Sequence, residues 1–286
     1  MILIADSGSS KVDWAFVSST REKRMRTCGI NPTYLTDDKI LEILHDGFSF
    51  ARDYDVNDIF FFGAGVVGSQ MQTRLESCFK TLWPSAECRF YSDVLASALA
   101  LFGEERGIAC ILGTGSNSCL CEGGQIVRNI RAGGFILGDE GSGAWIGKRL
   151  LQDYIKEIMP EPVRGEFERE YSLSYSQIVD RVYRQERPAA YMAQLSMFAA
   201  ARMEDGYIRE LVADGFDEFL CRNVLRYEEC FSVPVGFVGS VAMQYREILE
   251  SCMQKRNLTL GSVLKAPIDN LVCYYKSKCS GLTDIE

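Results

Sequence analysis

The chain has 286 residues, which is enough for two domains, and its apolar fraction of 47 % can fill a well-packed core. The charged fraction of 24 % is ordinary, and the net charge of −8 argues against a nucleic-acid surface, which needs a basic footprint. No apolar run approaches the ~18 residues of a membrane span. From the charge and the short apolar runs together, we expect neither a nucleic acid nor a membrane as partner.

The N-terminus and the cysteines indicate a cytoplasmic protein. The first residues, MILIADSGSS, lack the basic start of a signal peptide and read as a buried strand. The eleven cysteines are scattered without a C-x-x-C pair, which favours reduced thiols that pack as small apolar groups. The single histidine, His45, lies in a predicted amphipathic helix, so proton transfer is expected to fall to carboxylates.

The hydrophobic pattern predicts alternating strands and helices, which is typical of the α/β class. In the first part of the chain we expect strands at residues 1–4, 13–17, 59–62 and 89–91, a charged loop or hairpin at 20–26, a turn at 31–32, and helices at 37–54, 69–82 and 93–102. In the second part we expect strands at residues 108–112, 118–121, 125–128 and 235–238, and helices at 142–158, 174–198, 203–219, 220–227, 241–253 and 267–278.

The start of the chain has a second copy 107 residues further on. Residues 2–10, ILIADSGSS, parallel residues 109–117, ACILGTGSN, and each is a buried strand followed by a glycine-bearing turn and a returning strand. The repeat predicts two related domains, at residues 1–106 and 107–286. We expect the second to carry a helical insertion around residues 150–230, and the last helix to pack back on the first domain.

Both repeated turns are candidates for binding phosphate. Hydroxyl groups and backbone N–H groups in a tight glycine turn form a concavity that suits anions, and two such turns can clamp a polyphosphate. The residues concerned are Ser7, Gly8, Ser9, Ser10 and Lys11 in the first turn and Gly113, Thr114, Gly115 and Ser116 in the second. Asp6 ends the first strand and can hold Mg²⁺ directly or through water. A plain β-turn explains residues 6–10 equally well.

A different motif lies at residues 63–68, where GAGVVG follows a predicted strand and precedes a predicted helix. This G-x-G-x-x-G pattern is typical of a dinucleotide-binding turn, and Asp93 lies 25 residues past its last glycine, at the end of a strand. The local spacing therefore allows a nicotinamide or flavin oxidoreductase. That interpretation leaves the repeated turns unexplained, and no Walker P-loop is present in the chain.

Five segments together resemble a known family. They are IADSGSSKVDW at residues 4–14, SDVLASA at 92–98, LGTGSNS at 112–118, GGFILGDEGSG at 133–143 and GSVA at 239–242. In this order they resemble the N-acetylglucosamine kinase and BadF/BadG-type branch of the actin/hexokinase-like ATPases. The resemblance implies two duplicated ribonuclease H-like domains with a central cleft, ATP and Mg²⁺ as cofactors, and a homodimer.

The resemblance also implies roles for single residues. Asp93 resembles the catalytic base that takes a proton from a sugar hydroxyl, Asp6 the Mg²⁺-linked carboxylate, and the two turns the phosphate loops. The residues that resemble adenosine contacts are Gly239, Ser240 and Met243, and those that resemble sugar ligands are Asn31, Asp93, Asn117 and Asp139. Simpler interpretations stay open: Asp93 as a helix cap, Asn31 as a turn residue, and Asp139 as a charge near a helix N-terminus.

The chain departs from the family's pattern in two places. The first phosphate turn reads DSGSS where many relatives have DGGGT, and residues 174–219 carry no motif that we can assign. The cysteine motif of BadF-type electron-transfer ATPases has no counterpart, so a kinase is favoured over an electron pump.

The predicted function is phosphorylation of an amino sugar by ATP, most of all N-acetylglucosamine to its 6-phosphate. The alternatives are a glucosamine or other hexose kinase, a BadF-type ATPase or a non-catalytic sugar or nucleotide sensor, and last a dinucleotide-dependent oxidoreductase. On the kinase interpretation the turn at Gly63, Ala64 and Gly65 forms a backbone-rich wall of the sugar pocket, because small residues at the end of a strand allow close approach.

Overall fold

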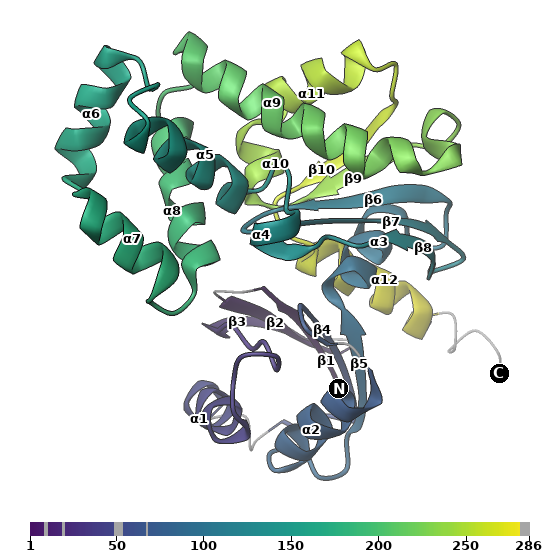
Figure 1. Cartoon of the computed structure of the whole chain (residues 1–286). Coiled ribbons are helices and arrows are strands. Elements are labelled where there is room, and N and C mark those ends of the chain that lie inside the picture. The colour runs from purple at the N-terminus through teal and green to yellow at the C-terminus, as the bar shows by residue number, and fades with distance from the viewer. Residues whose placement is uncertain (9–10, 19–20, 49–53, 67, 281–286) are drawn as a thin grey trace. The chain divides into compact units, whose positions relative to one another are not determined.

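The computed structural model describes residues 1–8, 11–18, 21–48, 54–66 and 68–280, and the chain divides into two compact units (Figure 1). Unit 1 comprises Met1–Glu104, Gly123–Gln125 and Ala266–Glu286. Unit 2 comprises Glu105–Glu122 and Ile126–Lys265. The last helix of the chain therefore belongs with the N-terminal residues.

A five-stranded mixed sheet forms the centre of unit 1. Its strands are β1 (Ile2–Ser7), β2 (Lys11–Val17), β3 (Glu22–Cys28), β4 (Asp58–Gly63) and β5 (Glu87–Ser92). They lie in the order β3-β2-β1-β4-β5, with β1, β2 and β3 antiparallel and β1, β4 and β5 parallel. The carboxyl ends of β1, β4 and β5 consequently meet at one edge of the sheet.

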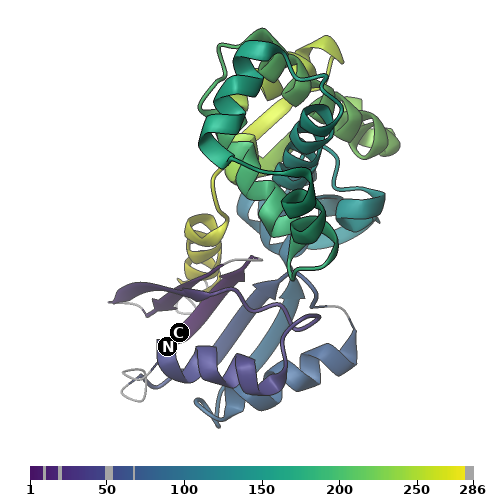
Figure 2. The ribbon, with the colours of Figure 1, turned by 60° about the vertical axis from the view of Figure 1, so that its left-hand side comes forward.

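The side chains of β4 point alternately to the two faces of this sheet, and both faces are covered by helices. Ile59 and Phe61 pack with Trp14 and Phe79 in the core. Helices α1 (Asp37–Gly47) and α2 (Ser69–Lys80) cover this face of the sheet (Figure 2). On the other face lie α3 (Asp93–Phe102) and α12 (Ile268–Ser280), which contact each other and the sheet. The ring of Tyr275 on α12 lies 4.1 Å from that of Phe60, measured between centroids.

Unit 2 is built on a second five-stranded sheet. Its strands are β6 (Gly107–Leu112), β7 (Ser116–Glu122), β8 (Gln125–Ile130), β9 (Val235–Val238) and β10 (Leu260–Leu264), in the order β10-β9-β6-β7-β8. Strand β6 pairs antiparallel with β7 and parallel with β9, and β9 pairs parallel with β10. Read from β8, this order repeats that of unit 1 strand for strand, so the predicted α/β fold with two duplicated domains of the actin/hexokinase type is confirmed.

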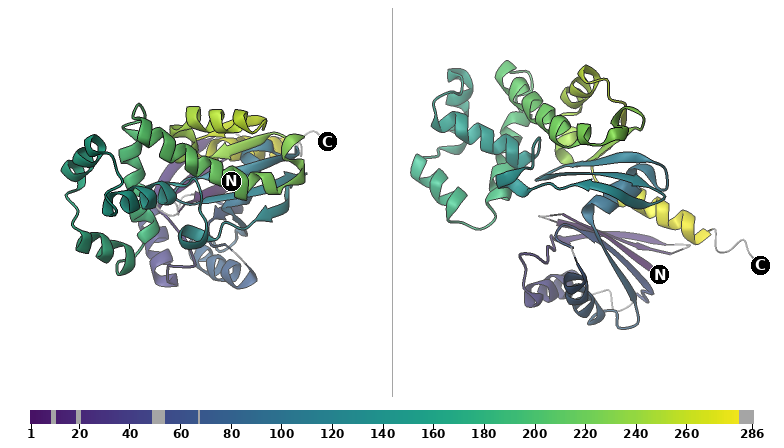
Figure 3. Two further views of the ribbon diagram at one scale, coloured as in Figure 1. Left: turned by 45° about the horizontal axis from the view of Figure 1, so that its top comes forward. Right: turned by 45° about the vertical axis from the view of Figure 1, so that its right-hand side comes forward.

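Helices make up most of unit 2. They are α4 (Gly134–Leu137), α5 (Gly143–Ile155), α6 (Glu161–Tyr171), α7 (Tyr175–Tyr183), α8 (Pro188–Ala200), α9 (Gly206–Arg222), α10 (Ser240–Gln244) and α11 (Arg246–Lys255), with short 3₁₀ turns at Val224–Arg226 and Glu228–Phe231. Helices α9 and α11 pack together beside the sheet (Figure 3), where Phe219 meets Phe237 of β9 with 6.3 Å between ring centroids. Buried apolar side chains from these helices and from β6 and β9 form one continuous core.

Several predicted elements differ from those observed. Residues 20–26 were expected as a charged loop or hairpin; from Glu22 on they belong to the edge strand β3, which pairs antiparallel with β2 and whose charged side chains are typical of a strand that must not pair further. The helix expected over 174–198 is two helices, because Arg187 adopts a left-handed conformation and Pro188 starts the second. Helix α6 and strand β10 were not predicted, and the helix expected over 37–54 ends at Gly47, with residues 49–53 outside the described part.

Two chain-wide properties bear on the sequence analysis. The ten cysteines whose side chains the structure describes are free thiols. Within the described part of the chain, no helix combines the length and hydropathy that a bilayer crossing needs.

Candidate functional site

Three neighbouring strands of unit 1 end together and bring three predicted segments to one edge. Ser7 pairs in register with Gly63, and Gly63 pairs with Ser92. Because β1, β4 and β5 are parallel, the first turn, the glycine turn at 63–66 and Asp93 all follow at this same edge. This is the position where α/β sheets hold ligands.

Asp6 lies directly opposite Asp13 in the hairpin of β1 and β2. Burial, together with the negative charges of Asp13 and Asp93, raises the pKa of Asp6 to about 7, although the Lys11 ammonium opposes this. Burial also acts on Asp13, but hydrogen bonds from Lys11 Nζ (2.6 Å) and Arg26 Nε (2.7 Å) outweigh it and hold the pKa of Asp13 below its usual value. Asp6 thus interacts with the carboxylates of Asp13 and Asp93, while Lys11 and Arg26 are bound to Asp13.

The described part of the first phosphate turn is firmly held. Ser7 Oγ donates to the carbonyl of Ile30 (2.7 Å) and accepts from the Ile30 N–H (3.1 Å), so this buried hydroxyl ties β1 to the chain segment after β3. Gly8 N–H donates to the Lys11 carbonyl (2.9 Å) and closes the turn. Ser9 and Ser10, also predicted to bind phosphate, lie outside the described residues.

Asp93 is the first residue of α3, and the cap of that helix is Ser92. The Ser92 hydroxyl accepts the Leu95 N–H (3.3 Å) in the manner of an N-cap. Asp93 Oδ1 accepts the adjacent Val94 N–H (3.0 Å), and the carboxylate is half-buried. Asp93 therefore does not serve as the cap that the sequence also allowed, and its charge is close enough to Asp6 to raise the pKa of that group.

Asn31 lies against the glycine turn. Its Oδ1 accepts the Thr33 N–H (2.9 Å), which is the turn role that the sequence left open. A Cβ atom added to Gly65 would lie 2.3 Å from Asn31 Oδ1 and 2.5 Å from Thr33 Oγ1, and Gly65 has a φ of 79°. Only glycine fits here, so the predicted sugar ligand Asn31 and the predicted wall residue Gly65 are direct neighbours.

In unit 2, the hairpin between β6 and β7 is joined to the start of α5. Gly113 N–H donates to the Gly115 carbonyl (3.0 Å), while the carbonyls of Gly113 and Thr114 accept the N–H groups of Gly143 (2.8 Å) and Ala144 (3.0 Å). The first-turn N–H groups of α5 are thereby used to fix the hairpin. The hairpin presents the rigid glycine backbone that phosphate binding needs.

Asp139 lies beside the same hairpin. Its Oδ1 accepts the Ser116 N–H (3.1 Å), and a Cβ atom on Gly115 would come within 3.0 Å of both carboxylate oxygens. Burial raises the pKa of Asp139 despite that hydrogen bond. The structure thus brings Asp139 together with the predicted phosphate loop of its own unit.

Asn117 has a partner that the sequence did not reveal. Its Oδ1 accepts the Ser118 N–H (2.9 Å) and the side-chain amide of Asn129 on β8 (3.0 Å). Asn129 Nδ2 also donates to the Ser118 carbonyl (2.6 Å). Asn129 was not a candidate, because only the pairing of β7 with β8 reveals this contact.

Gly239 joins the predicted adenosine segment to the phosphate hairpin. It follows β9 with a φ of 134°, and a Cβ atom there would lie 2.1 Å from the Leu112 carbonyl oxygen and 3.2 Å from the Gly113 nitrogen. Ser240 and Met243 belong to the following helix α10, and both are exposed. The predicted adenosine residues and the second phosphate turn therefore form one continuous edge of unit 2.

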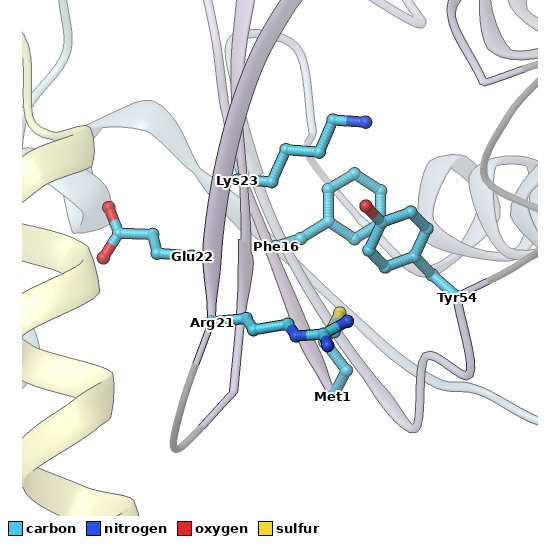
Figure 4. Close-up of a pocket in the computed structure, with 6 residues that line it drawn as sticks. All are labelled: Met1, Phe16, Arg21, Glu22, Lys23 and Tyr54. Carbon is cyan, nitrogen blue, oxygen red and sulfur yellow. The ribbon is translucent and has the colours of Figure 1, made fainter.

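A cavity of about 350 Å³ in unit 1 lies away from these residues. It is lined by Met1, Phe16, Arg21, Glu22, Lys23 and Tyr54, at the end of the sheet opposite to Asp6 (Figure 4). The Glu22 carboxylate points away from the other five side chains, toward α12, where it accepts from Lys276 at 2.6 Å. No candidate site residue lines this cavity.

The carboxylates of unit 1 fit a magnesium ion that takes most of its ligands from the phosphate oxygens of the nucleotide and from water. No group of three or more metal-ligating side chains is found among the described residues. Mg²⁺ in phosphate-transfer sites needs only one or two carboxylates, completed by water and phosphate oxygens. Asp6, whose pKa is raised by burial and by the negative charges of Asp13 and Asp93, is a carboxylate of this kind.

The repeated sheets and the two glycine-rich edges define a two-domain α/β protein of the actin/hexokinase type. Among solved structures, the chain is similar to a protein from Porphyromonas gingivalis provisionally assigned as an N-acetylglucosamine kinase, with 39 % identity, a TM-score of 0.91, and coverage of 97 % of this chain and 99 % of that one. The chain therefore belongs to the N-acetylglucosamine kinase and BadF/BadG-type family of sugar kinases within that superfamily.

Two more distant structures share the fold. One, from Chromobacterium violaceum, also carries a provisional N-acetylglucosamine kinase assignment; it is 17 % identical with a TM-score of 0.75 and covers 96 % of this chain and 98 % of that one. The other is a ROK-family glucokinase from Streptomyces griseus in complex with glucose and AMPPNP, at 14 % identity and a TM-score of 0.56, again covering 96 % and 98 %. Comparisons with family profiles and with curated proteins found no match.

Family membership also decides the meaning of residues 63–68. The dinucleotide pattern is present, but the structure packs Gly65 against Asn31 and Thr33. The glycine is thus needed for contact between two loops of unit 1, and the oxidoreductase alternative is dropped.

Proposed function

We propose that this protein phosphorylates N-acetylglucosamine with ATP and forms the 6-phosphate. The observation that carries the proposal is the shared strand edge in unit 1, where Asp6, Asp93 and the Asn31–Gly65 contact lie together. This edge offers a base and rigid polar groups for a polyol beside a carboxylate suited to Mg²⁺. The 39 % identical relative, covered over nearly its whole length, supports the same substrate.

Asp93 is the proposed general base. As the sugar 6-hydroxyl oxygen forms its bond to the γ-phosphorus, the bond from that phosphorus to the ADP oxygen breaks, and the hydroxyl proton passes to the Asp93 carboxylate. Phosphoryl transfer asks mostly for positioning and charge neutralisation, so a single carboxylate is sufficient as base. Asn31, Asn117 and Asp139, with the backbone of Gly63–Gly65, are the proposed ligands of the sugar.

The nucleotide phosphates are proposed to bind backbone N–H groups of the two glycine hairpins. In unit 2 we expect the N–H groups of Thr114 and Gly115 to donate, whereas Gly113 and Ser116, whose N–H groups are bonded to the Gly115 carbonyl and to Asp139 Oδ1, shape the hairpin. Gly239, Ser240 and Met243 of the adjoining edge would contact the adenosine. In unit 1, the half-exposed Lys11 ammonium contributes together with Ser9 and Ser10, and Gly8, whose N–H closes the turn, lets the phosphate approach the backbone. The Ser7 hydroxyl is committed to Ile30, so its proposed role is to hold the turn in shape.

Mg²⁺ would be held by Asp6, directly or through water, and by the nucleotide phosphates. When bound, it supplies positive charge that neutralises the transferring phosphoryl group. Asp13 would keep Lys11 and Arg26 in place beside that charge, through its hydrogen bonds to both.

The sugar preference is tested with the full chain and Mg-ATP. ADP release is measured against N-acetylglucosamine, glucosamine, N-acetylmannosamine and glucose, and the product is identified by ³¹P and ¹³C NMR. We expect the highest kcat/KM with N-acetylglucosamine and phosphorylation at O6. Preference for glucosamine or glucose would select the hexose-kinase alternative.

Two other outcomes would replace the proposed activity. ADP release that is independent of sugar would indicate a BadF-type ATPase. A ligand-dependent rise in Tm without ADP release would indicate a sensor. A cytoplasmic location and a homodimer stay predictions; sedimentation of the purified chain would test the homodimer.

A further inference from the structure

The loop that carries Asn31 has two anchors in unit 1. The first is Ser7, whose hydroxyl donates to the Ile30 carbonyl and accepts from the Ile30 N–H. The second is Arg74 of α2, whose guanidinium reaches the far half of the loop. Within the loop, the Tyr34 and Leu35 N–H groups both donate to the Asn31 carbonyl at 3.1 Å, so the loop is one compact turn.

Arg74 makes two hydrogen bonds to this turn and a third to Asp37, the first residue of α1. Nη1 donates to the Pro32 carbonyl (2.9 Å), Nη2 to the Leu35 carbonyl (3.0 Å) and Nε to Asp37 Oδ1 (2.8 Å). A guanidinium is a planar, permanently charged group with donors in a fixed fork, so it can hold three acceptors in one geometry. A lysine at this position would supply the charge without the fork.

Arg74 is also close to the glycine turn in sequence, because its helix begins directly after that turn. Helix α2 begins at Ser69, directly after the 63–68 segment, and Arg74 lies one and a half turns into it. Gly65 in that segment is in direct contact with Asn31 and Thr33. Arg74 therefore fixes the loop and the glycine turn relative to each other, by hydrogen bonds on one side and by its own helix on the other.

We propose that Arg74 is a positioning residue for sugar binding: it holds Asn31 against the Gly63–Gly65 turn so that both meet the substrate in a fixed geometry. This rests on the proposed function, in which those residues contact the sugar. Arg74 is not among the residues proposed to contact the substrate or the nucleotide. Small displacements of a ligand-binding group are costly, because binding depends on orientation set before the substrate arrives.

The test compares Arg74→Ala with Lys80→Ala, a control on the same helix that removes an exposed ion pair with Glu76 (2.8 Å). We expect Arg74→Ala to raise the sugar KM by about tenfold or more, the size of effect that follows from losing charge-assisted hydrogen bonds. The KM for ATP should stay within about twofold of wild type, because the phosphate hairpin of unit 2 is untouched. Lys80→Ala should change neither constant.

Two further variants separate the fork from the charge. Arg74→Lys keeps a cation near Asp37 and should behave like Arg74→Ala, since an ammonium cannot bridge both carbonyls. Asp37→Asn keeps the fork on Pro32 and Leu35 and should change the sugar KM only slightly. If Arg74→Lys restores the wild-type KM, or if Asp37→Asn is as damaging as Arg74→Ala, the fork has no special role and the proposal is overturned.

A second measurement is independent of activity. Amide hydrogen exchange at Tyr34 and Leu35 should accelerate in Arg74→Ala and Arg74→Lys and stay unchanged in Lys80→Ala. If the wild type shows no sugar-dependent ADP release, the proposed function fails, whereas the exchange rates still test the anchor. Unchanged exchange, or a loss of kcat with an unchanged sugar KM, would overturn the proposal; should Arg74→Ala not fold, Arg74→Lys and Asp37→Asn decide it.

Discussion

Asp6 and Asp13 face each other as a directly paired couple in the first hairpin, yet their pKa values move in opposite directions. Asp13 accepts hydrogen bonds from Lys11 and Arg26, which stabilise its ionised form. Asp6 is left with burial and with the negative charges of Asp13 and Asp93, which favour its protonated form. Lys11 and Arg26 thus stabilise the negative charge of Asp13. A further cation would stabilise the negative charge of Asp6, which suits a carboxylate that binds a metal ion.

The stability of unit 1 should fall as the pH rises from about 4 to about 7, and Asp6 should cause part of that fall. The pKa of Asp6 is about 7 in the folded chain against 3.8 ordinarily. The folded state binds the proton more tightly, so this contribution is fully present below about pH 4 and is lost as the pH reaches the folded value. The loss amounts to at most ~1.4 kcal/mol per pH unit.

Asp6→Asn should remove this part of the slope and make the variant more stable than wild type above pH 7. Urea unfolding between pH 4.5 and 8, followed by tryptophan fluorescence in a Trp145→Phe background, reports on unit 1 through Trp14 and Trp83. Glu76→Gln on the surface of α2 serves as control and should keep the wild-type slope. Equal slopes in Asp6→Asn and wild type would refute the raised pKa.

Asp93→Asn should strongly reduce turnover while sparing ATP binding. The amide keeps an oxygen that can accept the Val94 N–H, so α3 should start unchanged, but it cannot take a proton. We expect kcat to fall by about 10²- to 10⁴-fold, the usual contribution of general base catalysis. ADP-release kinetics and calorimetric titration with an ATP analogue measure the two properties.

The neighbouring Ser92→Ala separates capping from catalysis. It removes the acceptor of the Leu95 N–H and should lower the free energy of unfolding by ~1 kcal/mol. It should leave kcat close to wild type. A loss of kcat in Ser92→Ala as large as in Asp93→Asn would show that helix geometry, rather than the base, is what turnover depends on.

Gly239→Ala should weaken nucleotide binding and destabilise unit 2. The φ of 134° at this position is open only to glycine, and the added Cβ would meet the Leu112 carbonyl oxygen at 2.1 Å. The phosphate hairpin would have to move, and we expect a loss of about 1–3 kcal/mol in unfolding free energy. Gly261→Ala in β10 is the matched control, since its Cβ would find its nearest neighbour at an ordinary 3.5 Å. Equal ATP affinities in the two variants would contradict the close contact.

The repeated hairpins could be predicted because their signals are local. Each consists of a strand, a glycine turn and a returning strand within one short segment, residues 2–17 or 107–122, and the structure extends the repeat to all five strands of both sheets. Strand β3 gave no such signal: its side chains are exposed or half-exposed on both faces, so no apolar alternation marks it. Only pairing with β2 makes it a strand.

The site residues that sequence reasoning missed depend on contacts between distant segments. Arg26 binds Asp13 across the β2–β3 pair, Asn129 binds Asn117 across β7 and β8, and Arg74 binds a loop about forty residues before it. None belongs to a motif. Asp13 did leave a signal, because a charged residue within the apolar strand KVDWAFV is costly to bury unless it has partners.

Gly65→Ala and Gly68→Ala should both be strained but should affect the sugar differently. Both glycines have positive φ, 79° and 82°, so each substitution should cost about 1–3 kcal/mol of stability. At Gly65 the new Cβ would also lie 2.3 Å from Asn31 Oδ1, whereas at Gly68 it meets nothing within 4 Å. Only Gly65→Ala should therefore displace Asn31 and raise the sugar KM, with the KM for ATP unchanged in both. Steady-state kinetics at 25 °C with both substrates varied would measure this, and a sugar KM that rises equally in the two variants would show that backbone strain, not the contact with Asn31, is responsible.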